Sequence, residues 1–251
     1  MIKPEIHVHD DLEGSSRAVA DRFLELAKQR VSEAGRFSVA LSGGSTPRRL
    51  YQHLGSSDYS RRIDWGRVHL FQVDERCVPP DHAMSNFRMI RESLLTLAGV
   101  SPENIHRVRG ELAPEDAAGQ YASDLEKFYS TPPPDFPQFE LVFLGMGADG
   151  HVASIFPGST TMAETSRWVA VSNPGPEGLK RVTLTLPVLN AAAHIIFLVS
   201  GAQKSDTLAR ALDPQTQTRS LPVQNVRPVS GSVSWFLDRA AASRLQIDNT
   251  A

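Results

Sequence analysis

Cysteine is nearly absent from this sequence, and its scarcity excludes two kinds of site. The 251 residues include one cysteine, Cys77, so the chain can form neither a disulfide framework nor a thiolate metal cluster. We expect Cys77 to be a small, partly buried side chain rather than a nucleophile. The eight histidines show none of the spacings of a helical zinc site, and no metal is expected.

Long apolar runs and an excess of charge of one sign are also missing. No run reaches the roughly 18 residues that cross a membrane, and residues 1–14 contain no apolar core of a signal peptide. The net charge of −2 differs from the broad basic surface that binds nucleic acid. We therefore expect a cytoplasmic protein with no membrane or nucleic-acid partner, present as a monomer or a small homo-oligomer.

The composition is that of a globular protein, with 41% hydrophobic and 22% charged residues. A chain of this length can form one large α/β domain or two small ones. The proline-rich segment 131–134 is the one candidate for a linker. It does not by itself indicate a domain boundary, so we expect a single domain over residues 1–251.

Short apolar segments alternate with segments of helical periodicity. Strands are expected at residues 37–41, 68–73, 139–144, 168–171, 182–186, 195–199 and 233–237. Helices are expected at residues 15–34, from Pro47 onward, 86–97, 114–129, 202–212 and after the last strand, with a loop over 74–85. Continuously apolar strands that alternate with helices are typical of a parallel sheet covered on both faces. The predicted fold is therefore α/β, with a Rossmann-like, mostly parallel sheet and helices on both faces.

Three of the expected strands end in polar or glycine-rich segments, at residues 42–47, 74–76 and 145–151. Ligands of such sheets bind outside the carboxyl ends of the strands. We therefore predict that these three segments meet at one crevice.

The segment LVFLGMGADGH, residues 141–151, is the most informative of the three. Gly145, Gly147 and Gly150 fit the dinucleotide pattern G-x-G-x-x-G. Asp149 would place a negative charge where a pyrophosphate binds, and Pro157 follows too soon for a supporting helix, so no dinucleotide cofactor is expected.

His151 accounts better for this loop, because an imidazole can take a proton from water near neutral pH. Asp149, two residues earlier, could orient the ring or stabilise its protonated form. The alternative is structural: His151 would cap the next helix, and Asp149 would be a turn residue. The buried strand and the three glycines that precede His151 favour the catalytic interpretation.

The segment SGGSTP, residues 42–47, has the parts of an anion-binding loop. Gly43, Gly44, Ser45 and Thr46 offer backbone amides and hydroxyls beside an expected helix N-terminus. The loop lacks the lysine of a nucleoside-triphosphate loop. A simple helix cap formed by Ser45 or Thr46 is the alternative.

Cations for a phosphate group are available at Arg76, Arg181 and Lys204. Arg76 follows an expected strand and could bind a phosphate through two parallel hydrogen bonds. It could instead form an internal salt bridge with Asp74 or Glu75, and Arg181 and Lys204 could be ordinary solvated charges. A sugar-phosphate dianion would need two or three of these cations at one place.

Together these segments resemble the 6-phosphogluconolactonase family, in the superfamily that also holds glucosamine-6-phosphate isomerase. The matching motifs occur in order along the chain: SGGSTP (42–47), DER (74–76), SNF (85–87), LGMGADGHVASIFPG (144–158), RVTLTLPVLNAA (181–192), FLVSGAQK (197–204) and WFLD (235–238).

The resemblance implies hydrolysis of 6-phospho-D-glucono-1,5-lactone to 6-phospho-D-gluconate, the second step of the oxidative pentose phosphate pathway, with no cofactor. It implies that His151 is the general base, with Asp149 beside it. It also implies a substrate site formed by Gly43, Gly44, Ser45, Thr46, Asp74, Arg76, Asn86, Arg181 and Lys204.

The isomerase relatives are the first alternative. They place a glutamate five residues after the histidine, where this sequence has Phe156, and a tyrosine where it has Arg76. Moving a proton between two carbons needs that acid–base pair, whereas lactone hydrolysis needs one base and one water, so the difference favours a lactonase. A non-catalytic sugar-phosphate-binding regulator is the second alternative, disfavoured because His151 is present.

Overall fold

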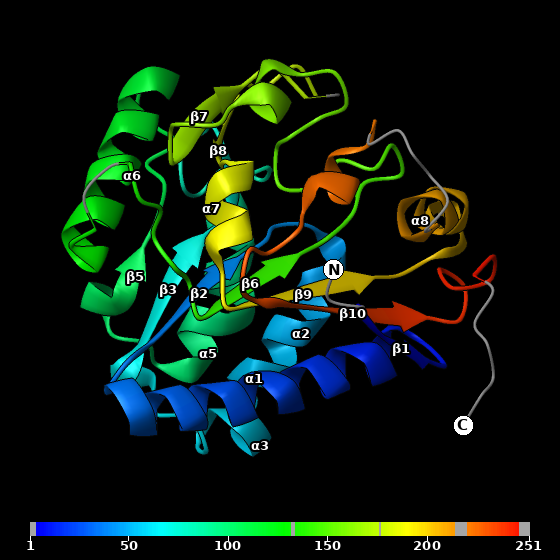
Figure 1. The fold of residues 1–251 in the computed structure, drawn as a ribbon. Coiled ribbons are helices and arrows are strands. Elements are labelled where there is room, and N and C mark those ends of the chain that lie inside the picture. Colours follow the sequence, from blue (N-terminus) through cyan, green and yellow to red (C-terminus); the bar gives the residue numbers. More distant parts are fainter. Residues whose placement is uncertain (1–3, 132–133, 176, 214–219, 246–251) are drawn as a thin grey trace.

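The computed structural model describes residues 4–131, 134–175, 177–213 and 220–245. Its centre is a seven-stranded sheet in the order β1-β10-β9-β6-β2-β3-β5, and each pair of neighbouring strands is parallel (Figure 1). These strands are β1 (Glu5–His9), β2 (Phe37–Leu41), β3 (Val68–Gln72), β5 (Ile105–His106), β6 (Leu141–Leu144), β9 (His194–Val199) and β10 (Ser232–Asp238). The predicted α/β fold with a mostly parallel sheet is confirmed.

Helices cover both faces of this sheet (Figure 1). On one face lie α1 (Leu12–Ala34), α2 (Ser45–Gly55), α3 (Ser57–Ser60), α4 (Asn86–Ile90) and α5 (Thr96–Ala98). On the other face lie α6 (Pro114–Tyr129), α7 (Leu186–Ala191) and α8 (Ser205–Leu212). Short 3-10 turns occur at Trp65–Arg67, Pro102–Asn104, Thr160–Ala163, Ala202–Lys204 and Pro222–Asn225.

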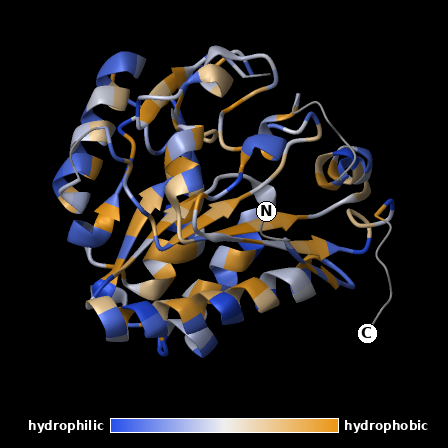
Figure 2. Cartoon of the chain, in the orientation of Figure 1, coloured by the Kyte–Doolittle hydropathy of each residue, from blue (hydrophilic) through white to orange (hydrophobic). Residues whose placement is uncertain are grey.

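The two central strands explain why both faces are covered. Every residue of β2 and β6 is buried. Successive side chains of a strand point to opposite faces, so Leu141 and Phe143 pack with α1 and α2, whereas Val142 and Leu144 pack with α6 and α7. Figure 2 shows the same pattern, with hydrophobic strands at the centre and hydrophilic stretches on the outer faces of the helices.

A second, antiparallel sheet of three strands was not predicted. It contains β4 (Asp74–Arg76), β8 (Arg181–Leu184) and β7 (Val169–Ser172), in the order β4-β8-β7. The expected loop over 74–85 is therefore wrong at its start. The backbone N–H of Val73 bonds to Leu41 in the main sheet, and its carbonyl accepts from Leu184, so the chain passes from one sheet to the other at this residue.

Several boundaries also differ from expectation. Helix α2 begins at Ser45 rather than Pro47, and Leu186 begins α7 instead of ending a strand. The expected helix over 86–97 contains a π-helical turn at Arg91–Leu95 between α4 and α5. Residues 239–245, where a last helix was expected, form turns, and the positions after 245 lie outside the described residues.

Local signals explain the two longest helices. The Asp11 side chain accepts a hydrogen bond of 2.8 Å from Gly14 N at the start of α1, and Gly35 ends that helix at φ 73°. Pro114 occupies the first turn of α6, which spans the range predicted for it. Among the described residues, no helix is long and apolar enough to cross a membrane.

Candidate active site

The predicted convergence of the strand ends is confirmed. The loops after β2, β6 and β9, together with residues of β4 and β8, line a single cavity of about 260 Å³. Ten of the predicted site residues line it: Gly43, Gly44, Ser45, Thr46, Asp74, Arg76, Asn86, His151, Arg181 and Lys204. Asp149 is not part of the lining and contacts the cavity through His151.

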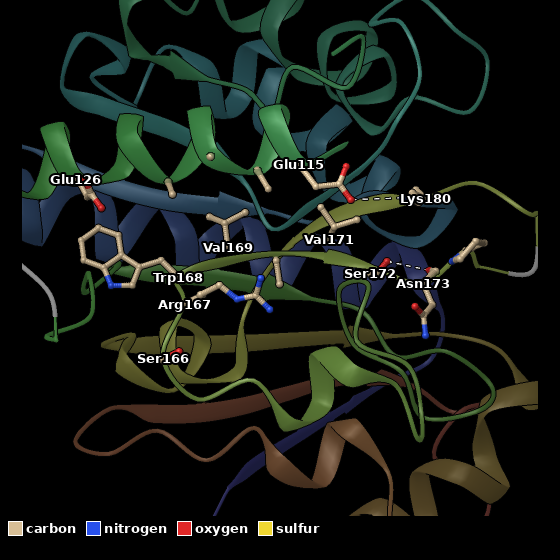
Figure 3. Close-up of a pocket in the computed structure, with 15 residues that line it drawn as sticks. Glu115, Glu126, Ser166, Arg167, Trp168, Val169, Val171, Ser172, Asn173 and Lys180 are labelled. Atoms are coloured by element: carbon tan, nitrogen blue, oxygen red, sulfur yellow. Dashed lines mark hydrogen bonds and ion pairs between the residues drawn. The ribbon is translucent and has the colours of Figure 1, made fainter. Parts of the chain in front are cut away.

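A larger cavity of about 670 Å³ lies elsewhere, between α6 and β7 (Figure 3). The ion pair between Glu115 and Lys180, at 3.4 Å, stands at one side of it. None of the predicted site residues lines this cavity. The larger cavity would be chosen as the active site by size alone, but the candidate catalytic and binding side chains line the smaller cavity.

The loop after β6 is a tight turn that presents His151. Gly150 has φ 83°, a conformation that favours glycine, and its N–H donates to Gly147 O at 3.0 Å. A Cβ on Gly147 would overlap both the His151 ring and the Asp149 carboxylate, so these side chains pack directly over the glycine backbone. The chain then continues into turns over residues 151–159 instead of a helix, so the alternative that His151 caps a helix is wrong, although Asp149 does lie in a turn.

The Asp149 carboxylate fixes the proton on the His151 ring. Oδ1 of Asp149 lies 2.6 Å from His151 Nδ1 and also accepts from the His151 backbone N–H at 3.1 Å. Burial opposes ionisation of Asp149, but the two hydrogen bonds and the charge of His151 outweigh it and hold the Asp149 pKa below its usual value. An ionised carboxylate only accepts hydrogen bonds, so Nδ1 carries the proton and Nε2 of neutral His151 keeps its lone pair.

Phe156 lies against the histidine. Its ring centroid is 4.8 Å from that of His151, and the Arg181 guanidinium carbon is 5.4 Å from the same Phe156 centroid. The face of an aromatic ring attracts a cation. The position where the isomerase relatives have a glutamate is therefore an apolar contact between the histidine and an arginine.

The N-terminus of α2 opens on the cavity without a side-chain cap. Gly44 is the N-cap residue at φ 105°, and no side chain of the described residues caps the helix, so the alternative of a cap formed by Ser45 or Thr46 is wrong. A Cβ on Gly43 would overlap the Asn86 side chain, so glycine allows the loop to touch α4. Uncapped helix amides favour an anion at this position.

Arg76 and Arg181 stand on neighbouring strands of the second sheet, and their Cα atoms are register partners. Arg181 is buried, and its guanidinium lies 3.4 Å from Ser154 Oγ and 3.9 Å from Asp74 Oδ2. Arg76 donates to the Asn86 side-chain oxygen. The alternative that Arg181 is an ordinary solvated charge is therefore wrong.

Glu177 contacts both arginines and was missed by the sequence analysis. Its Oε2 lies 2.5 Å from Arg181, and its Oε1 lies 3.7 Å from Arg76. Burial raises the pKa of a carboxyl group, but here the hydrogen bond and charge of Arg181, with the charge of Arg76, lower the Glu177 pKa overall. No motif marks this residue, because its partners meet only in the folded chain.

Glu75, unlike the exposed Glu177, is a buried carboxylate, and it does not pair with the Arg76 side chain. It accepts hydrogen bonds of 2.7 Å from the backbone N–H groups of Asn86 and Phe87, at the start of α4. Burial raises its pKa despite these bonds. Glu75 therefore fixes α4, and with it Asn86, against β4.

Lys204 adds a third cation at the opposite side of the strand ends. It ends the 3-10 turn Ala202–Lys204, directly before α8. Burial lowers its pKa, and the charge of Asp149 partly offsets that effect. No described residue forms an ion pair with Lys204, and no group of three metal-binding side chains was found within the described ranges.

This arrangement can be compared with known proteins. A family model described as glucosamine-6-phosphate isomerases/6-phosphogluconolactonase matches residues 10–235. The chain belongs to this family. The match spans most of the sequence and includes the glycine loop after β6, His151, Arg76 and Arg181.

Relatives with lactonase names cover nearly the whole chain. A 6-phosphogluconolactonase of Nostoc sp. is 36% identical over 228 residues, which are 90% of this chain and 92% of the relative. A probable chloroplastic 6-phosphogluconolactonase of Oryza sativa subsp. indica is 36% identical over 246 residues, 95% of this chain and 75% of the relative. The structure of 6-phosphogluconolactonase from Trypanosoma cruzi matches with a TM-score of 0.88 at 30% identity and covers 98% of each chain.

Proposed function

We propose that this protein hydrolyses 6-phospho-D-glucono-1,5-lactone to 6-phospho-D-gluconate. The observation that carries the proposal is the His151–Asp149 pair, which leaves Nε2 of His151 free as a base at a cavity that three cations surround. The named relatives at 36% identity support the substrate. The cytoplasmic location expected from the sequence stays a prediction, since some relatives carry the word chloroplastic in their names.

In this mechanism the phosphate of the substrate binds among the amides at the start of α2, Arg76, Arg181 and Lys204. Nε2 of His151 takes a proton from a water molecule, and the water oxygen attacks the carbonyl carbon C1. The C1–O bond of the ring then breaks, and the protonated His151 returns its proton to the departing ring oxygen. Asp149 holds the ring orientation and stabilises the positive charge that forms on it.

The isomerase alternative lacks support in the site geometry. Phe156 occupies the space beside His151 where a second acid–base group would be needed. The phenyl ring of Phe156, 4.8 Å from the His151 ring between centroids, can neither donate nor accept a proton. Hydrolysis needs only the one base that the cavity provides.

The decisive assay follows acid release from freshly generated 6-phosphogluconolactone, with the spontaneous rate subtracted. We expect clear acceleration by the protein, and none with glucosamine 6-phosphate in a parallel ammonia assay. His151→Ala should lower kcat by about a hundredfold or more, while inorganic phosphate binds as before.

His82→Ala is the matched control, because His82 is exposed and is not part of the cavity lining. It should keep full activity. A protein that does not exceed the spontaneous rate would refute the lactonase function. Full turnover by His151→Ala would remove His151 from the mechanism and leave the substrate assignment standing.

A further inference from the structure

Two like charges face each other in the second sheet. Arg76 of β4 and Arg181 of β8 are directly opposite in the antiparallel register, and both line the cavity. Like charges at opposite positions of a strand pair destabilise it, and the Arg181 side chain is only 5% exposed, where a charge without a partner is costly. Something must hold these two guanidinium groups together.

Glu177 has the geometry to do so. It gives one carboxylate oxygen to each arginine, at 2.5 Å from Arg181 and 3.7 Å from Arg76. Close approach depends on Gly175, because a Cβ there would lie 2.9 Å from the Arg181 guanidinium and 3.0 Å from Glu177 Oε2. Gly178, at φ 74°, donates its N–H to Gly175 O at 2.9 Å beside this contact.

The position of Glu177 distinguishes it from a competitor of the substrate. Both arginines line the cavity, whereas Glu177 does not. The Nε atoms of Arg76 and Arg181 are buried and have no hydrogen-bond partner among the described residues. The carboxylate accepts a hydrogen bond from Nη2 of Arg181 and forms an ion pair with Nη2 of Arg76, and it leaves both Nε donors unused.

We propose that Glu177 is a positioning residue, which bridges Arg76 and Arg181 and keeps both guanidinium groups directed at the phosphate of the substrate. This inference rests on the proposed function for the identity of that substrate. Without the bridge, the two cations repel each other and separate, and the phosphate loses a two-arginine clamp. Loss of the bridge does not alter proton transfer at His151, so it weakens only the binding of the substrate phosphate.

The test compares kcat, KM and phosphate affinity in three variants of the full chain. Glu177→Gln removes the charge of the bridge, and Glu177→Asp keeps the charge but shortens its reach. Glu115→Gln is the control, because it removes a nearby negative charge that pairs with Lys180 and does not touch either arginine. The affinity for inorganic phosphate is measured by calorimetry, which needs no turnover.

We expect Glu177→Gln to raise KM about fivefold and to weaken phosphate binding by a similar factor, with kcat within about twofold of the wild type. Glu177→Asp should lie between the two, and Glu115→Gln should match the wild type. Should Glu177→Gln fail to fold, Glu177→Asp alone carries the same comparison.

Two results would overturn the inference. A lower KM in Glu177→Gln would make Glu177 a competitor of the phosphate, and an unchanged KM with a lower unfolding midpoint would make it purely structural. A wild-type protein without lactonase activity would instead refute the proposed function. The calorimetric comparison would then still decide whether Glu177 positions the arginines for an anion.

Discussion

Gly147→Ala is the sharpest perturbation of the proposed mechanism, because it places one methyl group under the catalytic pair. The new Cβ would overlap Nδ1 and Cε1 of His151 and Oδ1 of Asp149. The Cβ would lie 2.1 Å from Nδ1 of His151, so to reach an ordinary contact of roughly 3.5 Å the ring must move by about 1.4 Å. The movement also separates the 2.6 Å hydrogen bond between the two side chains.

The structure separates the effect on activity from the effect on stability. Gly147 is not among the residues with positive φ, so alanine can adopt its backbone conformation. The atoms in the way belong to side chains that can rotate, and Asp149 is half exposed. We therefore expect a loss of unfolding free energy below about 1 kcal/mol. A misplacement of about 1 Å can nevertheless lower the catalysed rate by about a hundredfold.

The assay measures kcat and KM for the lactone together with unfolding in urea. Gly119→Ala is the control, since a Cβ at this glycine of α6 meets no described atom within 4 Å and Gly119 is not part of the cavity lining. We expect a fall in kcat only for Gly147→Ala, with KM and phosphate affinity nearly unchanged. Full activity in Gly147→Ala would show that the observed placement of His151 is not needed for the reaction, and the base assignment would fail.

Three other predictions follow from named contacts. Asp149→Asn should lower kcat at least tenfold, because an amide N–H beside Nδ1 would leave the proton on Nε2; equal rates would contradict this. Arg76→Ala should mainly raise KM, and unchanged affinity for 6-phosphogluconate would place the phosphate elsewhere. Burial, then the charge of His69, lowers the pKa of His106 to about 4, so unfolded chains bind a proton below pH ~6.5 that the folded protein does not. Between pH 6.5 and 4 the free energy of unfolding in urea should therefore fall by about 1–2 kcal/mol, a figure discounted for the partial exposure of His106. The fall should be smaller in His106→Leu, and an identical pH dependence in the two proteins would refute the prediction.

The parts of the site that were predictable are those whose signal is local. A buried strand that ends in glycine delivers the following side chains to the sheet edge, and this placed His151 and the loop at Gly43 correctly. The range of α6 was also predictable, because Pro114 and an amphipathic period mark it within one stretch of chain. None of these features depends on a distant partner.

The second sheet was not predictable for the opposite reason. Its strand β4 reads Asp-Glu-Arg, a polar triplet with no alternation that would indicate a strand. It forms because Val73 bonds to Leu41 on one side and Leu184 on the other. Leu184 lies more than a hundred residues further along the chain. Ser154, which donates to Asp74 Oδ2 at 2.5 Å, was missed in the same way.

The second sheet determines the role of Arg76 and Arg181. In the sequence, Arg76 and Arg181 are two charges far apart, for which the alternatives were an internal salt bridge of Arg76 and a solvated charge at Arg181. The register places them opposite each other at the cavity and buries Arg181. A buried cation beside a second, partly buried one persists only where carboxylates compensate the charge, which explains why Asp74 and Glu177 both stand beside Arg181. A phosphate dianion therefore binds at a site whose own charges are already nearly balanced. The affinity for phosphate must then depend on the geometry of the hydrogen-bond donors more than on net charge, and a variant with lysine in place of Arg76 or Arg181 should bind phosphate less well.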